Sequence, residues 1–381
     1  MPIYFDYAAT TPVRPEAVRA ACEALTGSFG NPSSGYAPGR QAAAELKAHR
    51  ADVAAALGCA AGEVFFTSCG TEADNWALRA AARMLRRRGE HIITTAVEHA
   101  AVLETARFLE GEGFRVTYLK PDRTGHISAD DFRAALCPET ILVSMMLVNN
   151  ETGAVFPVAE CARIAKAQNK DILFHTDAVQ GFCHIPFTPK ELGVDLLSVS
   201  GHKIGAPKGI GALYVRKDLQ GKFKPLLFGG EQEEGKRPGT EATAQIAAFA
   251  AACRAAKAEG WEPMERTRAV KDYALKRLTG QVPGLVVVSA GDAPHICAVS
   301  LPGYPSQMVM NALDARGFCV SNGSACHKGK PSHVFASLGL SGDVLKGVLR
   351  LSFAPASTEA EVDALAEALA EIAAERMSVM R

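Results

Sequence analysis

Lys203 has the clearest chemical setting of any residue in this chain. It follows the apolar run at 194–199 and the small residues Ser200 and Gly201, so it lies at the end of a predicted buried strand. A lysine amine that loses its proton on burial can form a Schiff base with a carbonyl group. A second apolar run ends at Asp177. Pyridoxal phosphate needs a lysine to hold its aldehyde and a carboxylate to keep its ring nitrogen protonated, so the pair indicates an enzyme that uses this cofactor.

Each of the two residues also has a simpler interpretation. Lysines that follow strands are commonly solvated loop residues, and an aspartate at a strand end commonly caps the next helix. Short motifs also match by chance, so the pair alone does not decide between the interpretations. The rest of the chain has to do so.

The composition is that of an ordinary globular protein. With 381 residues the chain is long enough for two domains, and 48% hydrophobic residues suffice for a large core. Lysine plus arginine equals aspartate plus glutamate at 41 each, so no net charge favours nucleic acid or an anionic membrane. The start of the chain has no signal-peptide pattern, and no apolar run reaches the ~20 residues of a membrane helix. We therefore expect a cytoplasmic protein that binds neither nucleic acid nor membrane.

Strands and helices alternate over the first part of the sequence. Helices are predicted at about 71–87, 102–110 and 158–169, and Thr71 and Asp74 have the spacing of a capping box. This alternation predicts an α/β fold with a mostly parallel sheet flanked by helices. Apolar runs predict its strands at 64–67, 91–95, 114–119, 140–148, 172–176, 195–199 and 211–215.

The pattern changes after a predicted helix at 243–258. Apolar runs at 286–288, 296–300 and 348–352 predict the strands of a smaller α+β unit. A final helix follows, which Thr358 and Glu361 can cap. We expect a large domain at 15–259 and a small domain formed by residues 1–14 and 260–381.

Common phosphate-binding motifs are missing or incomplete. The segment 230–237 nearly matches a P-loop, but Arg237 replaces the Ser or Thr that would hold magnesium. No G-x-G-x-x-G opens a helix, so a nicotinamide or flavin cofactor has no support. Gly70 and Thr71 at a helix N-terminus form a better phosphate site, because free backbone N–H groups and the helix dipole favour an anion. Further donors can come from Ser200 and His202.

Nine blocks of the sequence, in order, resemble the motifs of one enzyme family. They are YAATTP (7–12), FGNPSS (29–34), FTSCGTEADN (66–75), EH (98–99), VNNETG (148–153), HTDAVQ (175–180), SGHK (200–203), RPGT (237–240) and GSAC (323–326). This set is similar to the cysteine desulfurases, and the resemblance spans residue 4 to about residue 370. It implies the type I fold of pyridoxal phosphate-dependent transferases, in a class V aminotransferase-like enzyme. The implied reaction converts L-cysteine to L-alanine and leaves the sulfur on an enzyme cysteine as a persulfide.

The resemblance also implies which residues hold pyridoxal 5′-phosphate. Lys203 would bind the aldehyde, and Asp177 would hold the pyridine nitrogen. His99 would stack on the ring and relay protons. The other implied contacts are Gln180 at the ring hydroxyl and, at the phosphate, Gly70, Thr71, Ser200, His202 and Thr240, the last from the partner subunit of a homodimer.

A second implied group acts on the substrate. Arg350 would clamp the carboxylate of L-cysteine, since its planar fork makes two bonds to a carboxylate. Asn150 would approach both cofactor and substrate, and Asn31 is a further candidate for the carboxylate. Cys326 would accept the sulfur.

The segment around Cys326 departs from the family pattern. Small residues precede this cysteine, and the short basic run His327 to Pro331 follows it, so we expect a mobile loop in which the two lysines favour a thiolate. The acceptor of the sulfur stays open: an iron–sulfur scaffold protein and the thiolation of tRNA or of other cofactors would all begin with the same persulfide. An iron–sulfur cluster bound through Cys326 would belong to such a partner complex, and we expect no metal site in the chain itself.

Other functions remain possible at this stage. A selenocysteine lyase or a class V aminotransferase would use the same cofactor, although an aminotransferase would not need Cys326. A non-catalytic sulfur carrier or scaffold-binding module could keep the fold. The presence together of Lys203, Asp177, His99 and Arg350 argues against such a module.

Overall fold

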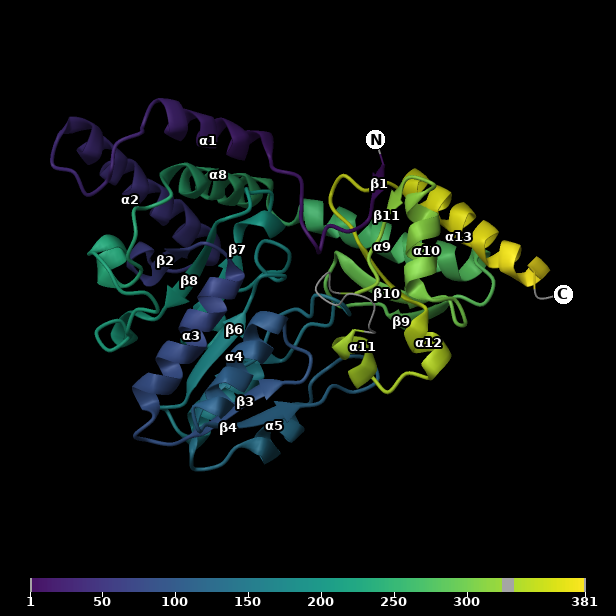
Figure 1. The fold of residues 1–381 in the computed structure, drawn as a ribbon, viewed down its shortest axis with the longest axis horizontal. Coiled ribbons are helices and arrows are strands. Elements are labelled where there is room, and N and C mark those ends of the chain that lie inside the picture. The colour runs from purple at the N-terminus through teal and green to yellow at the C-terminus, as the bar shows by residue number, and fades with distance from the viewer. Residues whose placement is uncertain (1, 324–331, 380–381) are drawn as a thin grey trace.

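Two larger β-sheets organise the chain in the computed structural model, which describes residues 2–323 and 332–379 (Figure 1). The first has seven strands in the order β2-β8-β7-β6-β5-β3-β4. Strand β8 is antiparallel to both of its neighbours, and the other neighbouring strands are parallel. The predicted α/β fold with a mostly parallel sheet is therefore confirmed. The strands are β2 (Val64–Thr67), β3 (His91–Thr95), β4 (Arg115–Leu119), β5 (Thr140–Ser144), β6 (Leu173–Asp177), β7 (Leu196–Ser200) and β8 (Gly211–Val215).

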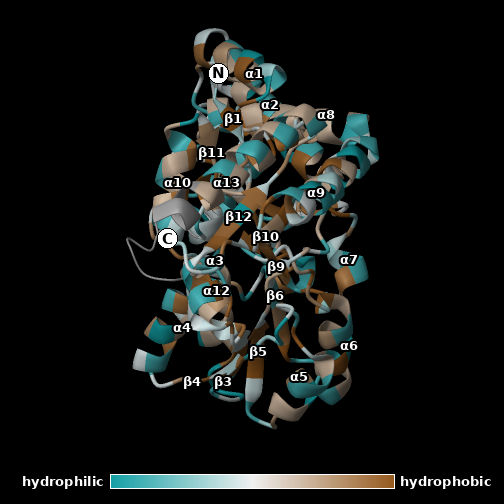
Figure 2. Ribbon diagram, turned by 90° about the vertical axis from the view of Figure 1, so that its right-hand side faces the viewer, coloured by the Kyte–Doolittle hydropathy of each residue, from teal (hydrophilic) through white to brown (hydrophobic). Residues whose placement is uncertain are grey.

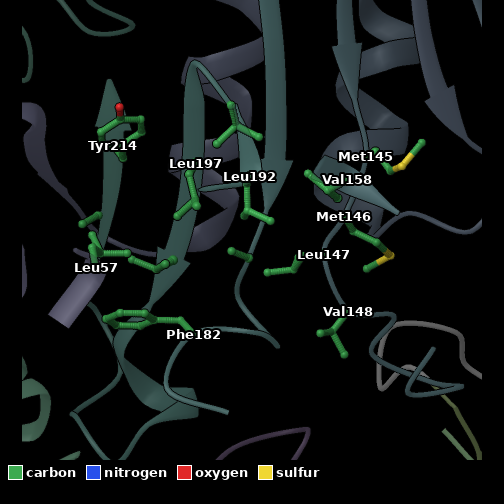
Figure 3. Packing of buried hydrophobic residues seen from close by; sticks show 14 of the residues in the cluster. Leu57, Met145, Met146, Leu147, Val148, Val158, Phe182, Leu192, Leu197 and Tyr214 are labelled. Carbon is green, nitrogen blue, oxygen red and sulfur yellow. The ribbon is translucent and has the colours of Figure 1, made fainter. Parts of the chain in front are cut away.

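The inner strands of this sheet are buried on both faces, which explains their nearly continuous apolar sequences. Successive residues of a strand point to opposite faces of the sheet. Leu196 accordingly lies in one apolar cluster with Trp76 of α3 (Gly70–Leu85), whereas Leu197 lies in the cluster on the other face with Phe182. Figure 3 shows Leu197 and Phe182 in this second cluster.

Helices cover both faces of the seven-stranded sheet (Figure 1). On one face α3 packs against α4. On the other, residues of α6 and α8 join the apolar cluster, and α1 and α2 pack against α8. The helices are α1 (Pro15–Thr26), α2 (Ala37–Leu57), α4 (Ala100–Gly111), α5 (Ala129–Ala135), α6 (Val158–Gln168), α7 (Pro189–Leu192) and α8 (Thr243–Glu259).

The second sheet is antiparallel, with β10 (Ile296–Ser300) between β12 (Val348–Ser352) and β9 (Val286–Ser289). Its strands β10 and β12 are mostly brown in Figure 2, next to helices of mixed hydropathy. Strand β1 (Ile3–Tyr4) pairs in parallel with β11 (Phe318–Cys319). The helices of this part are α9 (Glu262–Gln281), α10 (Ser306–Asp314), α11 (His333–Ser337), α12 (Gly342–Lys346) and α13 (Glu359–Val379).

The two ends of the chain share one apolar core. Phe5 lies in the same buried cluster as Leu351 of β12 and Leu365 of α13. The cap predicted for the last helix is present, because the Glu361 N–H donates to Thr358 Oγ1 at 3.2 Å and the Thr358 N–H donates to Glu361 Oε2 at 2.8 Å. A separate core of this kind supports the predicted small domain, whose boundaries at residues 14 and 260 we retain as a proposal.

The expected capping box at the start of α3 is wrong. The helix begins at Gly70, and Cys69 at its N-cap makes no capping bond through its side chain. Glu72 Oε2 instead accepts from the Ser68 N–H at 2.8 Å, while Asp74 is buried. The first N–H groups of α3 are thereby left without a side-chain cap, which is the arrangement that an anion site requires.

Strand β5 is shorter than predicted. It ends at Ser144, and the apolar residues 145–148 continue as an irregular buried segment with one isolated bridge, from Val148 to Val155. Apolar sequence alone does not distinguish a buried strand from a buried loop. Within the described ranges, no helix is long and apolar enough to cross a lipid bilayer.

Candidate active site

A cavity of about 350 Å³ lies where β6 and β7 end and α3 begins. Ligands of open α/β sheets bind at this carboxyl edge of the strands. Ten of the predicted site residues line it: Gly70, Thr71, His99, Asn150, Asp177, Gln180, Ser200, His202, Lys203 and Arg350. Seven further residues complete the lining: Ala8, Ala9, Cys69, Asp74, Met146, Val148 and Val179.

Lys203 reaches the cavity from a single 3-10 turn, Gly201–Lys203, that follows β7 directly. Its Nζ donates to the carbonyl oxygens of Ala8 and Ala9, at 2.7 and 2.8 Å. These carbonyls belong to the N-terminal segment, far from Lys203 in sequence. The amine is thus held inside the cavity instead of extending into solvent, which is the setting that a covalent lysine needs.

Asp177 is the last residue of β6 and is buried. Its Oδ1 accepts from the Val179 N–H at 2.9 Å. Burial raises the pKa of Asp177, while the neighbouring His99 and Lys203 oppose that rise. Lys203 in the same cavity therefore favours the charged form of the Asp177 carboxylate.

His99 caps the start of α4, where its Nδ1 accepts from the Ala101 N–H at 3.1 Å. Burial lowers the pKa of His99, and Lys203 adds to that effect, although Asp177 raises it. A neutral ring whose Nδ1 accepts a hydrogen bond carries its proton on Nε2. His99 is consequently held as a single tautomer with one N–H to donate.

The start of α3 has the shape and the donors of an anion cradle. A Cβ added at Gly70 would lie 2.8 Å from Val179 Cγ2, so a larger residue would collide with the loop after β6. Ser200 and His202 line the same cavity as Thr71. Burial, together with Lys203 and Lys208, lowers the pKa of His202 to about 4, which leaves its ring neutral. Backbone and side-chain donors at a helix N-terminus suit a phosphate group.

Arg350 enters the cavity from β12 of the second sheet. Its Nη1 donates to the carbonyl oxygen of Asn150 at 2.9 Å, and its Nη2 lies 2.6 Å from Asp6 Oδ1. Within the described part of the chain, Arg350 Nε and Asn150 Oδ1 are buried without a hydrogen-bond partner. Two such groups side by side fit a ligand that carries a carboxylate and an amine.

The chain matches the Aminotransferase class-V family over residues 3–365. It is 41% identical to the cysteine desulfurase IscS of Methanosarcina thermophila, over 97% of this chain and 91% of that protein. It is 40% identical to the cysteine desulfurase IscS of Clostridium botulinum (strain Kyoto / Type A2), over 98% and 95% of the two chains.

This chain belongs to the cysteine desulfurase family. The solved structure of a NifS-like protein agrees, with a TM-score of 0.92 and 34% identity over 98% of this chain and 99% of that one. A structure described as SspA in complex with cysteine has a TM-score of 0.81 and 34% identity, over 93% and 100% of the chains. The fold is that of the type I pyridoxal phosphate enzymes, and the chain is an enzyme.

Two predicted site residues of this desulfurase are not brought into the cavity, and a third lies outside the described residues. Thr240 and Asn31 are exposed and do not line it, and Asn31 Oδ1 instead accepts from the Ser33 N–H at 2.9 Å. Cys326 lies outside the described residues. The roles of all three stay predictions.

Buried carboxyls beside the cavity were missed by sequence reasoning. Asp74 lines it, and Glu98 is fully buried next to His99. Both belong to the sequence blocks at 66–75 and 98–99, but neither stood at a strand end. For Asp74 the helical period was a usable signal, because it follows Gly70 by one turn and so lies on the same face of α3. Asp6 is a third missed carboxyl, and no local pattern marks it.

Proposed function

We propose that this desulfurase converts L-cysteine to L-alanine with pyridoxal 5′-phosphate held in the cavity, and that Cys326 takes the sulfur as a persulfide. The observation that carries this proposal is the meeting in one cavity of Lys203, Asp177 and His99 from the large sheet with Arg350 from the small one. These residues supply a covalent amine, a carboxylate, a flat ring and a cation for a carboxylate. Residues with a purely structural role would not need to bring these four chemical groups together.

The described residues fit the cofactor at each of its polar groups. We assign Lys203 to the aldehyde, Asp177 to the pyridine nitrogen and His99 to the face of the ring. When bound, the cofactor stores the electron pair that remains after the bond from Cα to hydrogen breaks. Gln180 would reach the ring hydroxyl, and the phosphate would be held by Gly70, Thr71, Ser200 and His202.

The substrate carboxylate is assigned to Arg350, with Asn150 beside it. Arg350 already holds its fork in place through Asp6 and the Asn150 carbonyl. L-cysteine would therefore bind to the free Nε first and would compete with Asp6 for Nη2. Asn31, which lies outside the cavity in this chain, is the less favoured partner for the carboxylate.

Proton transfer is assigned to two residues of the cavity. The amine of Lys203, once released from the aldehyde by the amino group of the substrate, would take the proton from Cα. His99 carries a proton on Nε2 and is neutral, so it can donate to a group that gains charge above the ring. Both groups line the same cavity.

The sulfur transfer is assigned to the Cys326 thiolate. Its attack on the substrate sulfur forms the S–S bond while the bond from Cβ to sulfur breaks, and the electron pair stays on the substrate, which takes up protons to become alanine. The described residues on either side of the Cys326 segment lie near the cavity. A Cβ at Gly323 would lie 3.0 Å from Glu151 Oε2, and His333 Nε2 lies 3.1 Å from the Glu98 carbonyl oxygen.

We also propose a homodimer whose two sites each take Thr240 from the partner subunit. Thr240 and Asn31 are exposed, and strongly exposed apolar side chains lie near them in sequence, including Phe29 and Phe228. A second copy of the chain that covers these side chains would bring Thr240 to the phosphate of the other site. A two-fold assembly of this kind is closed and common.

The persulfide would be passed to an acceptor protein in the cytoplasm, either an iron–sulfur scaffold or a protein of another thiolation pathway. The similar SspA has been solved with cysteine, which supports this amino acid as substrate here. Selenocysteine is the alternative substrate, and nothing in the described cavity favours it.

The purified protein with pyridoxal phosphate tests the proposal. We expect a visible absorbance band that borohydride abolishes while fixing the cofactor to Lys203 in the peptide map. L-cysteine should yield alanine and bound sulfane sulfur in equal amounts. A protein that stays colourless with added cofactor would refute the proposal, and a strong preference for selenocysteine would favour the lyase.

A further inference from the structure

Asp74 is a buried carboxyl at the wall of the cavity with no role in the mechanism above. It lies one turn inside α3, and its exposed fraction is 1%. It hydrogen bonds with Ser198 of β7. Its Oδ1 lies 3.5 Å from His175 Nε2 and, within the described ranges, has no hydrogen-bond partner. A carboxyl in such a place is costly to keep charged.

His175 is the histidine in contact with Asp74, and it carries no charge. His175 Nδ1 lies 2.9 Å from Ser144 Oγ, and its Nε2 lies 3.0 Å from Ser198 Oγ. Burial lowers the pKa of His175 to about 3, so its ring is neutral. The 3.5 Å approach to Asp74 is therefore a contact between polar groups and not an ion pair.

Among the described residues, the main charged neighbours that shift the pKa of Asp74 are acidic, although His99, His202 and Lys203 line the same cavity. Asp177 from β6 raises the pKa of Asp74 most after burial itself, and Glu98 and Cys69 raise it further. Only the hydrogen bond from Ser198 acts in the opposite direction. Apart from this hydrogen bond, burial and the acidic neighbours of Asp74 thus favour its protonated form.

Asp177 has the opposite surroundings, although it is also buried. Lys203 favours its charged form, and the Val179 N–H donates to it. Two carboxyls that share one buried site do not ionise together, and the proton goes to the one with fewer positive neighbours. The charge belongs on Asp177 and the proton on Asp74.

We propose that Asp74 is a positioning residue that acts as a neutral carboxylic acid beside Asp177, so that the cavity presents a single negative charge to the cofactor ring. This inference rests on the proposed function, which places the ring nitrogen at Asp177. Asp74 lines the same cavity as that carboxylate and hydrogen bonds with Ser198. As a neutral acid it adds no second charge that would repel Asp177 and hold the ring proton too tightly.

Two variants separate a neutral acid from a charged one. Asp74→Asn keeps the shape and the hydrogen bonds of a protonated carboxyl, whereas Asp74→Leu keeps the size but removes the carboxyl that hydrogen bonds with Ser198. We expect the dissociation constant for pyridoxal phosphate to change by less than about 3-fold in Asp74→Asn. In Asp74→Leu it should rise by about 10-fold or more, because unpaired buried polar groups are costly.

The protonation of Asp74 can be measured without an activity assay. The infrared spectrum of the wild type at neutral pH should contain a protonated-carboxyl band that Asp74→Asn lacks, and Glu98→Gln serves as the control for the other buried acid. The native state of the wild type binds a proton at Asp74 that the unfolded chain releases above the ordinary aspartate pKa. Its unfolding free energy should therefore fall with rising pH more steeply than that of Asp74→Asn.

The outcomes are distinct. A missing carboxyl band, or equal pH slopes in the two proteins, means that Asp74 is charged and overturns the proposal. So does cofactor binding that weakens as much in Asp74→Asn as in Asp74→Leu. If the wild type binds no pyridoxal phosphate the proposed function fails, while the infrared and unfolding measurements still decide the protonation of Asp74. If Asp74→Leu does not fold, the wild type and Asp74→Asn suffice for the same decision.

Discussion

The guanidinium of Arg350 is held by the carboxylate of Asp6, with Nη2 at 2.6 Å from Oδ1. The two residues come from opposite ends of the chain and meet where the segment after β1 runs beside β12, joined there by the bridge between Asp6 and Ser352. The side chain of Arg350 is 3% exposed and that of Asp6 is 20% exposed. The cation assigned to the substrate therefore has a carboxylate partner before any substrate arrives.

Asp6→Asn should make the protein less stable and its ligand binding tighter. Removal of one partner from a largely buried pair leaves a buried charge, and because Asp6 is partly exposed we expect a loss of about 2 kcal/mol in unfolding free energy. L-alanine, the proposed product, should bind about 3- to 10-fold more tightly, since it no longer competes with Asp6. Denaturant unfolding with and without L-alanine measures both effects.

The exposed pair Arg277–Asp363 provides the control for this variant. Asp363→Asn removes an ion pair whose residues do not line the cavity, and a surface pair contributes about 0–1 kcal/mol. Weaker binding of L-alanine to Asp6→Asn would show that Asp6 orients Arg350 more than it competes for it.

Lys203→Ala should abolish turnover and leave the fold intact. The variant removes the amine that takes the proton from Cα, a contribution of about 100-fold or more in rate, and it also removes the covalent attachment. Borohydride treatment followed by mass spectrometry should find no cofactor fixed to the variant. Lys208→Ala, at an exposed position in the loop after the same turn, is the matched control and should behave as the wild type. Cofactor fixed to another lysine in Lys203→Ala would show that Lys203 is not the covalent residue.

The sequence predicted those site residues that stand at the ends of strands. Asp177 and Lys203 were found because an apolar run marks each strand and the polar residue after it is conspicuous. Asp74 and Glu98 were missed, since a carboxyl inside a helix or after a turn is normally a surface residue and only the packed structure shows its burial. Asp6 reaches Arg350 only because the two ends of the chain pair, and no local sequence pattern predicts that pairing.

The same reasoning explains the wrong start of α3. The spacing of Thr71 and Asp74 fits a capping box, but tertiary burial of Asp74 outweighs this local preference. The large sheet was predictable because its strands are covered on both faces and are continuously apolar. The places of Thr240 and Asn31 were not, since both are exposed in the single chain and the proposed role of Thr240 needs a second one.

Glu98 should make the stability of the protein depend on pH. Its Oε1 accepts from the Met146 N–H at 2.9 Å and from Thr95 Oγ1 at 2.8 Å, and burial raises its pKa to about 8. The native state thus keeps a proton that the unfolded chain loses above its ordinary pKa. Stability falls as pH rises from about 4.5 to about 8 and changes little beyond, as far as this group is concerned.

Glu98→Gln removes that dependence while it keeps the hydrogen-bonding shape. Its unfolding free energy should therefore exceed that of the wild type increasingly from about pH 5 to about pH 8. Equilibrium unfolding across this range is the measurement. A parallel pair of curves would mean that Glu98 is charged in the native protein.

Phe228→Asp should convert the proposed dimer into monomers. Phe228 is 90% exposed in the single chain, and a charge at the centre of an apolar contact is strongly unfavourable. Sedimentation should report the monomer, and the dissociation constant for pyridoxal phosphate should rise because Thr240 of the partner subunit is lost. Met308→Asp, at an exposed apolar position on α10, is the control and should remain a dimer. A wild type that is monomeric and fully active would contradict the assembly.

Cys326→Ser should separate cofactor chemistry from sulfur transfer. The variant keeps Lys203, Asp177 and Arg350, so its visible band and the change of that band on adding L-cysteine should match the wild type. Without the thiolate, almost no alanine and no bound sulfane sulfur should form. Cys69→Ser is the decisive comparison, because Cys69 is the cysteine among the described residues that lines the cavity. Mass spectrometry of the wild type after exposure to L-cysteine should locate the persulfide on Cys326, and a persulfide on Cys69 or Cys319, or undiminished alanine formation in Cys326→Ser, would assign the nucleophile elsewhere.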